Sequence, residues 1–272
     1  MYSEIIKYFE SINPMQGALY ATCFTWFVTA LGAAFVFFIK KGNPNIFNAL
    51  LGFTGGVMIA ASVWSLLIPA INMTEGDGFT QTIPTVIGFM IGVGCLFLID
   101  KLLPTLHGSF RQKNGIKTQK QKTALMILAI TLHNIPEGLA IGVLFGGVAI
   151  GLPEASIAAA VTLAIGIGLQ NFPEGIAVAI PLRRIGMSRR KSFFYGQLSA
   201  IVEPIAGVLG VIAVTTFTPI LPYALAFAAG AMIYVVINEV IPESQKKGNT
   251  DFSTMGFIGG FMIMMILDVA LG

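Results

Sequence analysis

Two similar ten-residue stretches, "TLHNIPEGLA" at residues 131–140 and "GLQNFPEGIA" at residues 168–177, decide how this chain folds. Each places a proline and a glutamate inside an apolar run that otherwise suits a lipid environment. Pro136 and Pro173 clash with the carbonyl groups four residues earlier, so we expect them to interrupt and kink their helices. Unpaired backbone oxygen at membrane depth is tolerated only beside a cavity, so the two kinks predict a cavity within the membrane.

The composition places the chain in a bilayer. Of its 272 residues, 55% are hydrophobic and 11% are charged, and the mean hydropathy is +0.82. A soluble domain carries about 25% charged residues, so this chain cannot cover a globular surface with charge. Residues 1–14 are too polar for a signal peptide, so the first apolar run is expected to remain in the protein. Cys23 and Cys95 lie in apolar runs, which indicates buried residues rather than a disulfide or a metal cluster.

Apolar segments long enough to cross a bilayer recur along the chain, separated by short stretches rich in Gly, Pro and Asn. We therefore expect one integral-membrane domain over residues 1–272. Close helix packing is predicted at three small-xxx-small pairs: Gly52/Gly56, Gly88/Gly92 and Gly256/Gly260. The eight predicted spans lie near 17–39, 46–72, 82–104, 124–148, 154–182, 192–217, 220–243 and 253–271.

The basic residues indicate the orientation of these spans. All but one of the 16 Lys and Arg residues lie around the loops after the first, third, fifth and seventh spans. By the positive-inside rule these loops are cytoplasmic, and both termini lie outside. The net charge of +3 therefore reflects topology and predicts no nucleic-acid partner.

Carboxylates lie deep inside several predicted spans. Glu137, Glu174 and Glu203 are well inside spans four, five and six, while Glu239 and, less deeply, Asp268 lie in spans seven and eight. An ionisable group at mid-bilayer costs at least ~2.5–3.5 kcal/mol on insertion scales. Several such groups near one depth require a strong compensating interaction, and a bound cation supplies one.

The spacing around these carboxylates fits a metal site. The His and Glu of the first motif share a helix face at i, i+4, and the Gln and Glu of the second motif repeat this spacing. Imidazole nitrogen and carboxylate oxygen suit a first-row divalent metal such as zinc. One such residue alone could equally be a hydrogen-bonding residue between helices, but two motifs and Glu203 on a third span favour a metal site. The candidates in the motifs are His133, Asn134, Glu137, Gln170, Asn171 and Glu174.

Other polar positions give weaker signals. Met58 and Ser65 share a face of span two at i, i+7, although a Met in an apolar helix is usually a packing residue. His107 lies in a basic loop, where we expect it to be solvated. Asp100 and Asp268 could be helix-packing partners, and no role is assigned to them.

The two motifs cross the membrane in opposite directions, because the loop charges orient spans four and five oppositely. A motif repeated on antiparallel helices implies a two-fold axis in the membrane plane, and such inverted repeats with ion sites at discontinuous helices are typical of secondary transporters. A second similarity, between "SVWSLLIPA" (62–70) and "VVINEVIPE" (235–243), extends the symmetry. We therefore expect an all-α membrane protein in which spans one to three and six to eight are inverted triplets around spans four and five, a 3+2+3 arrangement.

With "HNIPEG" and "QNFPEG" at this spacing, essentially the whole sequence resembles the ZIP family of zinc- and iron-regulated transporter-like proteins. It looks most like the prokaryotic GufA-type branch, which has stretches similar to "VMIAASVWSLLIP" (57–69) and "INEVIPES" (237–244). The resemblance implies a multi-pass protein of the cell (inner) membrane that forms a homodimer.

The resemblance also implies a binuclear metal centre midway through the membrane, in which Glu137 and Glu174 bridge both metals. Ser65 is expected to line the outer path, and Asn238 and Glu239 the cytoplasmic exit. The implied ligands are Met58, His133, Glu137, Gln170 and Glu174 for one metal and Asn134, Glu137, Asn171, Glu174 and Glu203 for the other.

The chain departs from some relatives in three features. Some have Asp where Asn171 stands, and the missing charge is expected to weaken or retune the second metal. Some have His where Asn238 stands, which implies a weaker exit ligand here. Many have a histidine-rich cytoplasmic loop, whereas His107 is alone in that loop, so metal sensing by the loop is not expected.

The predicted function is import of a divalent metal, with no resident cofactor. Zn2+ is the first expected substrate, and Fe2+, Mn2+, Cd2+ and Co2+ are alternatives. The resemblance implies an elevator-like motion in which spans one, four, five and six carry the metal past the other spans. The sequence contains no G-x-x-x-x-G-K-[ST] loop, so ATP-driven transport by this chain alone is not expected, whereas proton coupling stays open.

Two other classes of function are the alternatives. An intramembrane metalloenzyme needs a motif such as H-E-x-x-H, and the two histidines, His107 and His133, form no such motif, so no enzyme is expected. A non-transporting metal sensor needs a soluble reporting domain or a long loop, and neither is expected from this sequence.

Overall fold

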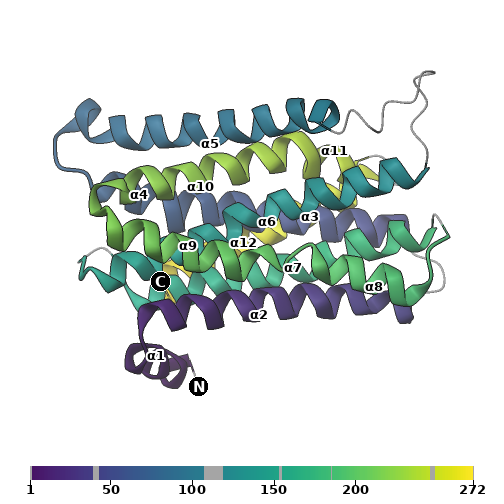
Figure 1. Cartoon of the computed structure of the whole chain (residues 1–272), viewed down its shortest axis with the longest axis horizontal. Helices are drawn as coiled ribbons and strands as arrows, with labels where there is room; N and C mark the ends of the chain where they lie inside the picture. Colours follow the sequence, from purple (N-terminus) through teal and green to yellow (C-terminus); the bar gives the residue numbers. More distant parts are fainter. Residues whose placement is uncertain are drawn as a thin grey trace.

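Long helices running side by side along one axis form the molecule (Figure 1). The computed structural model describes the backbone of residues 2–38, 43–106, 119–152, 155–184, 186–245 and 249–271, and their side chains except at 103–106, 119–130, 133 and 184. Within these ranges all regular structure is helical and no strand occurs. The helices are α1 (Tyr2–Ser11), α2 (Pro14–Ala34), η1 (Phe35–Phe37), α3 (Pro44–Ala61), η2 (Ser62–Leu67), α4 (Ile68–Asn72), α5 (Gly78–Leu106), α6 (Gln119–Ala149), α7 (Ile157–Arg184), α8 (Arg189–Leu198), α9 (Val202–Thr216), η4 (Thr218–Ile220), α10 (Leu221–Val235), η5 (Val236–Val240), α11 (Ile241–Ser244) and α12 (Thr250–Leu271).

The helical segments agree with the predicted spans to within a few residues. For the span predicted near 124–148, side chains are described over only part of the helix. That part contains the apolar helical segment Asn134–Ala149. The all-α membrane class is therefore confirmed, while the count of eight spans stays a prediction. Seven segments in the described part of the chain are long and apolar enough to cross a membrane: Pro14–Phe37, Pro44–Asn72, Gly78–Leu102, Ile157–Arg183, Arg189–Thr216, Thr218–Ser244 and Thr250–Leu271.

Asn13 and Asn43 determine where α2 and α3 begin. Each side chain accepts a hydrogen bond from the backbone N–H two residues later, and a proline follows each Asn at the first helical position. A capping Asn satisfies an N–H that the helix leaves unpaired, and proline at the next position has no N–H to lose. Both helices therefore begin two or three residues before the predicted spans.

No interruption occurs at Pro136 or Pro173, because α6 and α7 continue through both prolines, so the prediction of interrupted helices is wrong, whereas the kinks stay a prediction. The interruption lies instead in the sixth predicted span, between α8 and α9. Pro204 has no N–H for the carbonyl of Ala200, which accepts the N–H of Glu203 at 3.0 Å. Glu203 therefore lies in the first turn of a helix that begins inside an apolar segment.

Two π-helical segments, η2 and η5, precede Pro69 and Pro242. In each, the N–H of the residue after the segment bonds to the carbonyl five residues earlier. They occur in the two stretches whose sequences are similar, 62–70 and 235–243. The π-helix is rare and is frequent at functional sites, and it was not predicted from the sequence.

Glycines bring pairs of helices into backbone contact. The main pairs are α3 with α12, α5 with α10, α6 with α9 and α2 with α7. At Gly56 on α3, a Cβ atom would lie 2.0 Å from the carbonyl oxygen of Phe257 on α12, and at Gly260 on α12 it would lie 2.2 Å from that of Phe53 on α3. At the other predicted small-xxx-small positions a Cβ would also lie within 2.5 Å of a carbonyl oxygen on the partner helix. Close packing at these pairs is thus confirmed.

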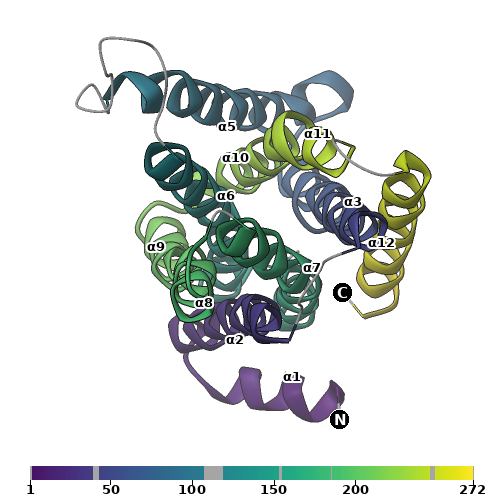
Figure 2. The same ribbon diagram turned by 90° about the vertical axis from the view of Figure 1, so that its right-hand side faces the viewer.

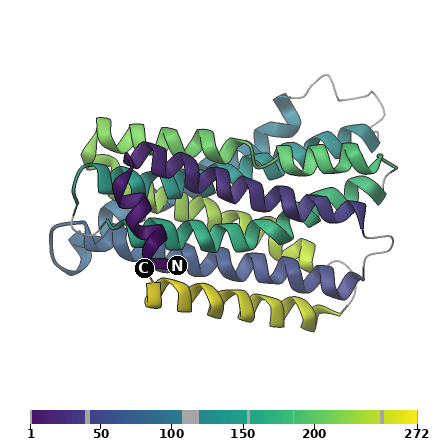
Figure 3. The same ribbon diagram turned by 90° about the horizontal axis from the view of Figure 1, so that it is seen from below.

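The described ends of the chain lie at the same end of the bundle (Figures 1 and 3). The hydroxyl of Tyr2 in α1 donates to the carbonyl oxygen of Leu271 in α12 at 2.8 Å and lies 2.9 Å from the hydroxyl of Thr162 in α7. α1 was not predicted from the sequence. It lies beside α2 (Figure 2), and through Tyr2 it contacts both α7 and the end of α12.

The neighbouring residues Gly259 and Gly260 of α12 provide a test of this packing. We expect Gly260→Ala to destabilise the protein by about 1–3 kcal/mol, because its methyl group overlaps a backbone carbonyl that cannot move aside. Gly259→Ala is the control, since no described atom outside its own helix lies within 4 Å of the added Cβ. Thermal unfolding of the purified protein in detergent checks this, and equal midpoints for the two variants would contradict it.

Candidate metal centre

A buried polar cluster lies where α6, α7 and α9 meet, beside α2. The four helices are neighbours in the view along the bundle, whereas α5 and α12 lie at its edges (Figure 2). The side chains of the cluster have no solvent exposure. The members are Asn134 and Glu137 on α6, Gln170 and Asn171 on α7, Glu203 on α9 and Thr25 on α2.

Glu137 and Gln170 form the first contact of the cluster. The side-chain amide of Gln170 donates a hydrogen bond to Oε1 of Glu137. Oε2 of Glu137 and Oε1 of Gln170 are buried and have no hydrogen-bond partner among the described residues. This pair therefore presents two buried oxygen atoms that can accept a further partner.

Glu203 forms the second contact and is held from three sides. Its Oε1 accepts hydrogen bonds from Nδ2 of Asn134 at 3.2 Å and Nδ2 of Asn171 at 2.9 Å. Its Oε2 accepts one from the hydroxyl of Thr25. Because both amides turn their N–H groups toward Glu203, their Oδ1 atoms point elsewhere. Both Oδ1 atoms are buried without a partner in the described part of the chain.

The electrostatics of the cluster favour a cation. The carboxylates of Glu137, Glu174 and Glu203 repel one another. A buried oxygen without a donor loses the free energy of its bonds to water, and the cluster contains four such atoms. A divalent ion would satisfy these oxygens and offset the repulsion.

Amides supply much of this donor set. Among the described side chains, no group of three or more His, Cys, Asp and Glu could hold a metal ion. The described donors are therefore carboxylate oxygens together with the amide oxygens of Asn134, Gln170 and Asn171. The side chain of His133, the predicted nitrogen ligand, lies outside the described residues.

Gly138 and Gly175, which follow the two glutamates of the motifs, bring the neighbouring helices close. A Cβ at Gly138 would lie 2.3 Å from the carbonyl oxygen of Glu203, and one at Gly175 would lie 2.1 Å from that of Thr29. These contacts place α9 against α6 and α2 against α7. The glycines of the motifs thus bring Glu203 and Thr25 to the cluster.

Met58 and Glu174 are the remaining predicted ligands with described side chains. Met58 is buried on α3, one turn after Thr54, whose hydroxyl donates to the carbonyl oxygen of Gln170 at 3.3 Å. This face of α3 therefore packs on α7 near the cluster. Glu174 is half-buried on α7, one turn after Gln170, and is close enough to Glu137 and Glu203 to repel both.

The predicted path residues Ser65 and Asn238 lie in the two π-helical segments and contact aspartates. Ser65 in η2 lies 3.0 Å from both carboxylate oxygens of Asp268 on α12. Asn238 in η5 donates to Oδ2 of Asp100 on α5 at 3.0 Å, and the hydroxyl of Tyr234 donates to the same oxygen at 3.0 Å. Each π-helical segment is thus joined to an acidic side chain of a neighbouring helix. Beside Asn238, the predicted exit residue Glu239 is half-buried.

Asp100 and Asp268 were expected only as possible helix-packing partners, and their hydrogen bonds to neighbouring helices confirm that expectation. Their contacts with Ser65 and Asn238 were not predicted, although "FLIDKLL" (97–103) and "MILDVAL" (265–271) give both the same setting near the end of a span. Thr25 was also missed. The signal there was a line of threonines along an apolar helix, which are Thr22, Thr25 and Thr29.

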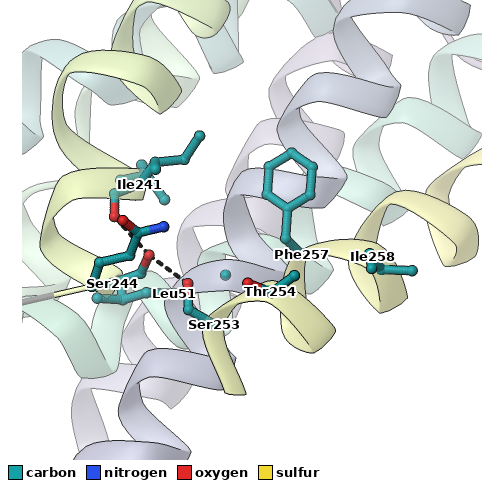
Figure 4. Close-up of a pocket in the computed structure, with 10 residues that line it drawn as sticks. Leu51, Ile241, Ser244, Ser253, Thr254, Phe257 and Ile258 are labelled. Atoms are coloured by element: carbon teal, nitrogen blue, oxygen red, sulfur yellow. Dashed lines mark hydrogen bonds between the residues drawn. The ribbon is translucent and has the colours of Figure 1, made fainter. Parts of the chain in front are cut away.

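A separate pocket of about 160 Å3 lies between α3, α11 and α12 (Figure 4). The hydroxyl of Ser253 donates to that of Ser244 at 2.6 Å, which joins α12 to α11. Its described lining residues include none of the candidate metal ligands. The pocket therefore lies apart from the candidate metal centre.

The sequence of this chain is similar to those of known zinc transporters. A family model described as "ZIP Zinc transporter" matches residues 111–268. The zinc transporter ZIP11 of Xenopus tropicalis is 41% identical, over 97% of this chain and 99% of the relative, and ZIP11 of Homo sapiens is 40% identical, over 94% and 97%. The zinc transporter GufA of Myxococcus xanthus is 35% identical, over 95% of this chain and 100% of the relative.

Substitution of Gln170 tests the cluster. Gln170→Leu removes the amide that holds Glu137 and one of the unpaired oxygens, so we expect binding of Zn2+ to weaken by about 10–100-fold. Calorimetric titration of the purified protein measures this. Gln197→Leu is the control, because that amide bonds to Trp26 outside the cluster. Equal affinities of the two variants would count against the cluster as a metal centre.

Proposed function

Because this chain belongs to the ZIP zinc transporter family, we propose that it carries zinc from outside into the cytoplasm through the buried cluster. As a family member it is a transporter and not an enzyme. The observation that carries the proposal is a group of buried oxygens with no donor among the described residues, because a cation at membrane depth would satisfy them all. These atoms are Oδ1 of Asn134, Oε2 of Glu137, Oε1 of Gln170 and Oδ1 of Asn171.

We propose that the centre binds two metals, as the sequence resemblance implies. The hydrogen bonds support this, because they divide the cluster into two groups that fit the two ligand sets. Glu137 with Gln170 belongs to the first set, and Glu203 with both asparagines belongs to the second. The proposed ligands are Met58, His133, Glu137, Gln170 and Glu174 for the first metal and Asn134, Glu137, Asn171, Glu174 and Glu203 for the second.

The charge of the site limits how tightly it holds its cargo. Glu137, Glu174 and Glu203 supply fewer negative charges than two divalent ions carry as positive charges. An entering ion exchanges its water ligands for carboxylate and amide oxygens, and the first ion relieves most of the repulsion among the carboxylates. The second ion then binds more weakly, which favours its release toward the cytoplasm. Zn2+ is the proposed cargo, with Fe2+, Mn2+, Cd2+ and Co2+ as further candidates.

The orientation of the proposed path in the membrane rests on the charges of the loops, and the inward direction of transport is proposed from the resemblance to the family. We propose that both termini lie outside, and the contact between Tyr2 and Leu271 supports their location on one side. The path then runs from Ser65 on the outer side through the cluster to Asn238 and Glu239 on the cytoplasmic side. The eight-span 3+2+3 arrangement, the homodimer and the cell (inner) membrane are proposed from the resemblance.

An elevator motion fits the way the helices pair. α2, α6, α7, α8 and α9 hold most of the proposed ligands, and the remaining long helices are the proposed static wall. Backbone contacts at glycines pair helices within one of these groups: α6 with α9 and α2 with α7 in the first, and α3 with α12 and α5 with α10 in the second. Such contacts favour each group moving as a unit.

Removal of Glu137 tests the function directly. We expect Glu137→Ala to reduce uptake of radioactive zinc into proteoliposomes to the level of protein-free liposomes, because the site loses a carboxylate that bridges both metals. Glu10→Ala is the control, since Glu10 is exposed on α1. Zinc uptake that survives the loss of Glu137 would contradict the proposed pathway.

A charge at residue 171 tests the second metal. We expect Asn171→Asp to tighten binding of the second ion, because the added carboxylate replaces a neutral amide beside Glu203. Calorimetric stoichiometry and competition among Zn2+, Cd2+ and Mn2+ measure this. An unchanged stoichiometry and metal profile would show that residue 171 does not contact a metal.

A further inference from the structure

Thr25 on α2 is the one threonine in the line of Thr22, Thr25 and Thr29 whose described hydroxyl donates a hydrogen bond to another helix. Thr22 donates to the carbonyl of Ala18 at 2.7 Å, and Thr29 donates to the carbonyl of Thr25 at 3.3 Å. Such bonds to the preceding turn are the ordinary use of threonine in an apolar helix. Thr25 instead reaches Oε2 of Glu203 on α9, and its side chain is fully buried.

The Thr25 hydroxyl has one proton and a second acceptor within reach, the carbonyl oxygen of Thr22 at 2.9 Å. A carboxylate is the stronger acceptor, because hydrogen bonds to an ionised group are roughly twice as strong as those between neutral groups. Among the described residues, Thr25 is the donor to Oε2 of Glu203, whereas Oε1 is held by Asn134 and Asn171. Thr25 therefore fixes the rotation of this carboxylate.

The backbone of Thr25 also orients Asn171. Nδ2 of Asn171 donates to the carbonyl oxygen of Thr25 at 3.3 Å and to Oε1 of Glu203 at 2.9 Å. With both N–H groups engaged, Oδ1 of Asn171 is directed away from them and stays without a partner in the described part of the chain. One residue of α2 thus acts on two of the proposed ligands of the second metal.

We propose that Thr25 is a positioning residue for zinc transport: it holds Glu203 and Asn171 so that the oxygens of the second ligand set stay directed at the metal. This inference rests on the proposed function, because Thr25 acts through ligands of that site. Residues that orient metal ligands in this way alter affinity by about 10–100-fold when they are removed.

The test compares Thr25→Val with Thr25→Ser. Valine has the same shape as threonine without the hydroxyl, whereas serine retains the hydroxyl without the methyl group. We expect Thr25→Val to weaken Zn2+ binding, and to raise the zinc concentration that gives half-maximal uptake, by about 10–100-fold, and Thr25→Ser to stay near wild type. Thr22→Val is the matched control, because Thr22 is equally buried and bonds only within its own helix.

Two results would overturn the proposal. In the first, Thr25→Val binds and transports zinc like Thr22→Val, and in the second, Thr25→Ser is as impaired as Thr25→Val, which would assign the effect to packing. Thermal unfolding in detergent establishes that each variant is folded. If Thr25→Val fails to fold, Thr25→Ala enters the same comparison with the same expectation.

Wild type and Glu137→Ala in the same assay separate this inference from the proposed function. Absence of zinc uptake by wild type would remove the proposed function. Uptake by wild type that Glu137→Ala abolishes and Thr25→Val leaves unchanged would remove only the role of Thr25.

Discussion

The burial of Glu137 and Glu203 inside apolar helices is the constraint on which the rest of the structure depends. A carboxylate away from water must find donors or a cation, and the cost of leaving it without them is large on the scale of protein stability. Here the described donors are the neutral side chains of Gln170, Asn134, Asn171 and Thr25. Neutral donors hold the carboxylates in place and leave their negative charge for an ion.

The packing of the helices follows from this requirement. Amide and hydroxyl side chains are short, so α6, α7, α9 and α2 must approach closely before these hydrogen bonds can form. Gly138 and Gly175 permit that approach, because each meets a carbonyl oxygen of the adjacent helix. The start of α9 before Pro204 adds a further stabilising effect, since it places Glu203 at the positive end of a helix dipole. The helix interruption that the sequence predicted at the two motifs therefore occurs in a different span.

The spans and the main members of the site could be predicted because each depends on local sequence. Apolar length locates a span, and i, i+4 spacing places the polar residues of a motif on one face. The effect of a proline could not be predicted in the same way. Pro136 and Pro173 lie within regular α-helix, Pro69 follows a π-helical segment, and Pro204 follows the start of a new helix. Neighbouring helices decide which outcome occurs, because they supply or withhold partners for the freed backbone groups.

The partners of residues that act across helices could not be predicted for the same reason. The role of Thr25 depends on its hydrogen bond to Glu203 of α9, and the role of Asp100 depends on its hydrogen bond from Asn238. Nothing within α2 or α5 alone distinguishes these side chains from ordinary polar residues of an apolar helix. The similar settings of Asp100 and Asp268 in the sequence were a usable signal, because a repeated pattern requires a common reason.

The contacts of the two aspartates bear on the proposed inverted repeat. Ser65 of the first triplet contacts Asp268 of the second, and Asn238 of the second contacts Asp100 of the first. A two-fold axis that exchanges the triplets would interchange these two pairs, and it would also interchange the two π-helical segments. Each end of the proposed path would then have the same arrangement, a π-helical segment hydrogen-bonded to an aspartate of a neighbouring helix. The side chains differ between the two ends, because a single hydroxyl contacts Asp268, whereas an amide and the Tyr234 phenol contact Asp100. Along the proposed path, the two ends would therefore hold a passing ion with different strength.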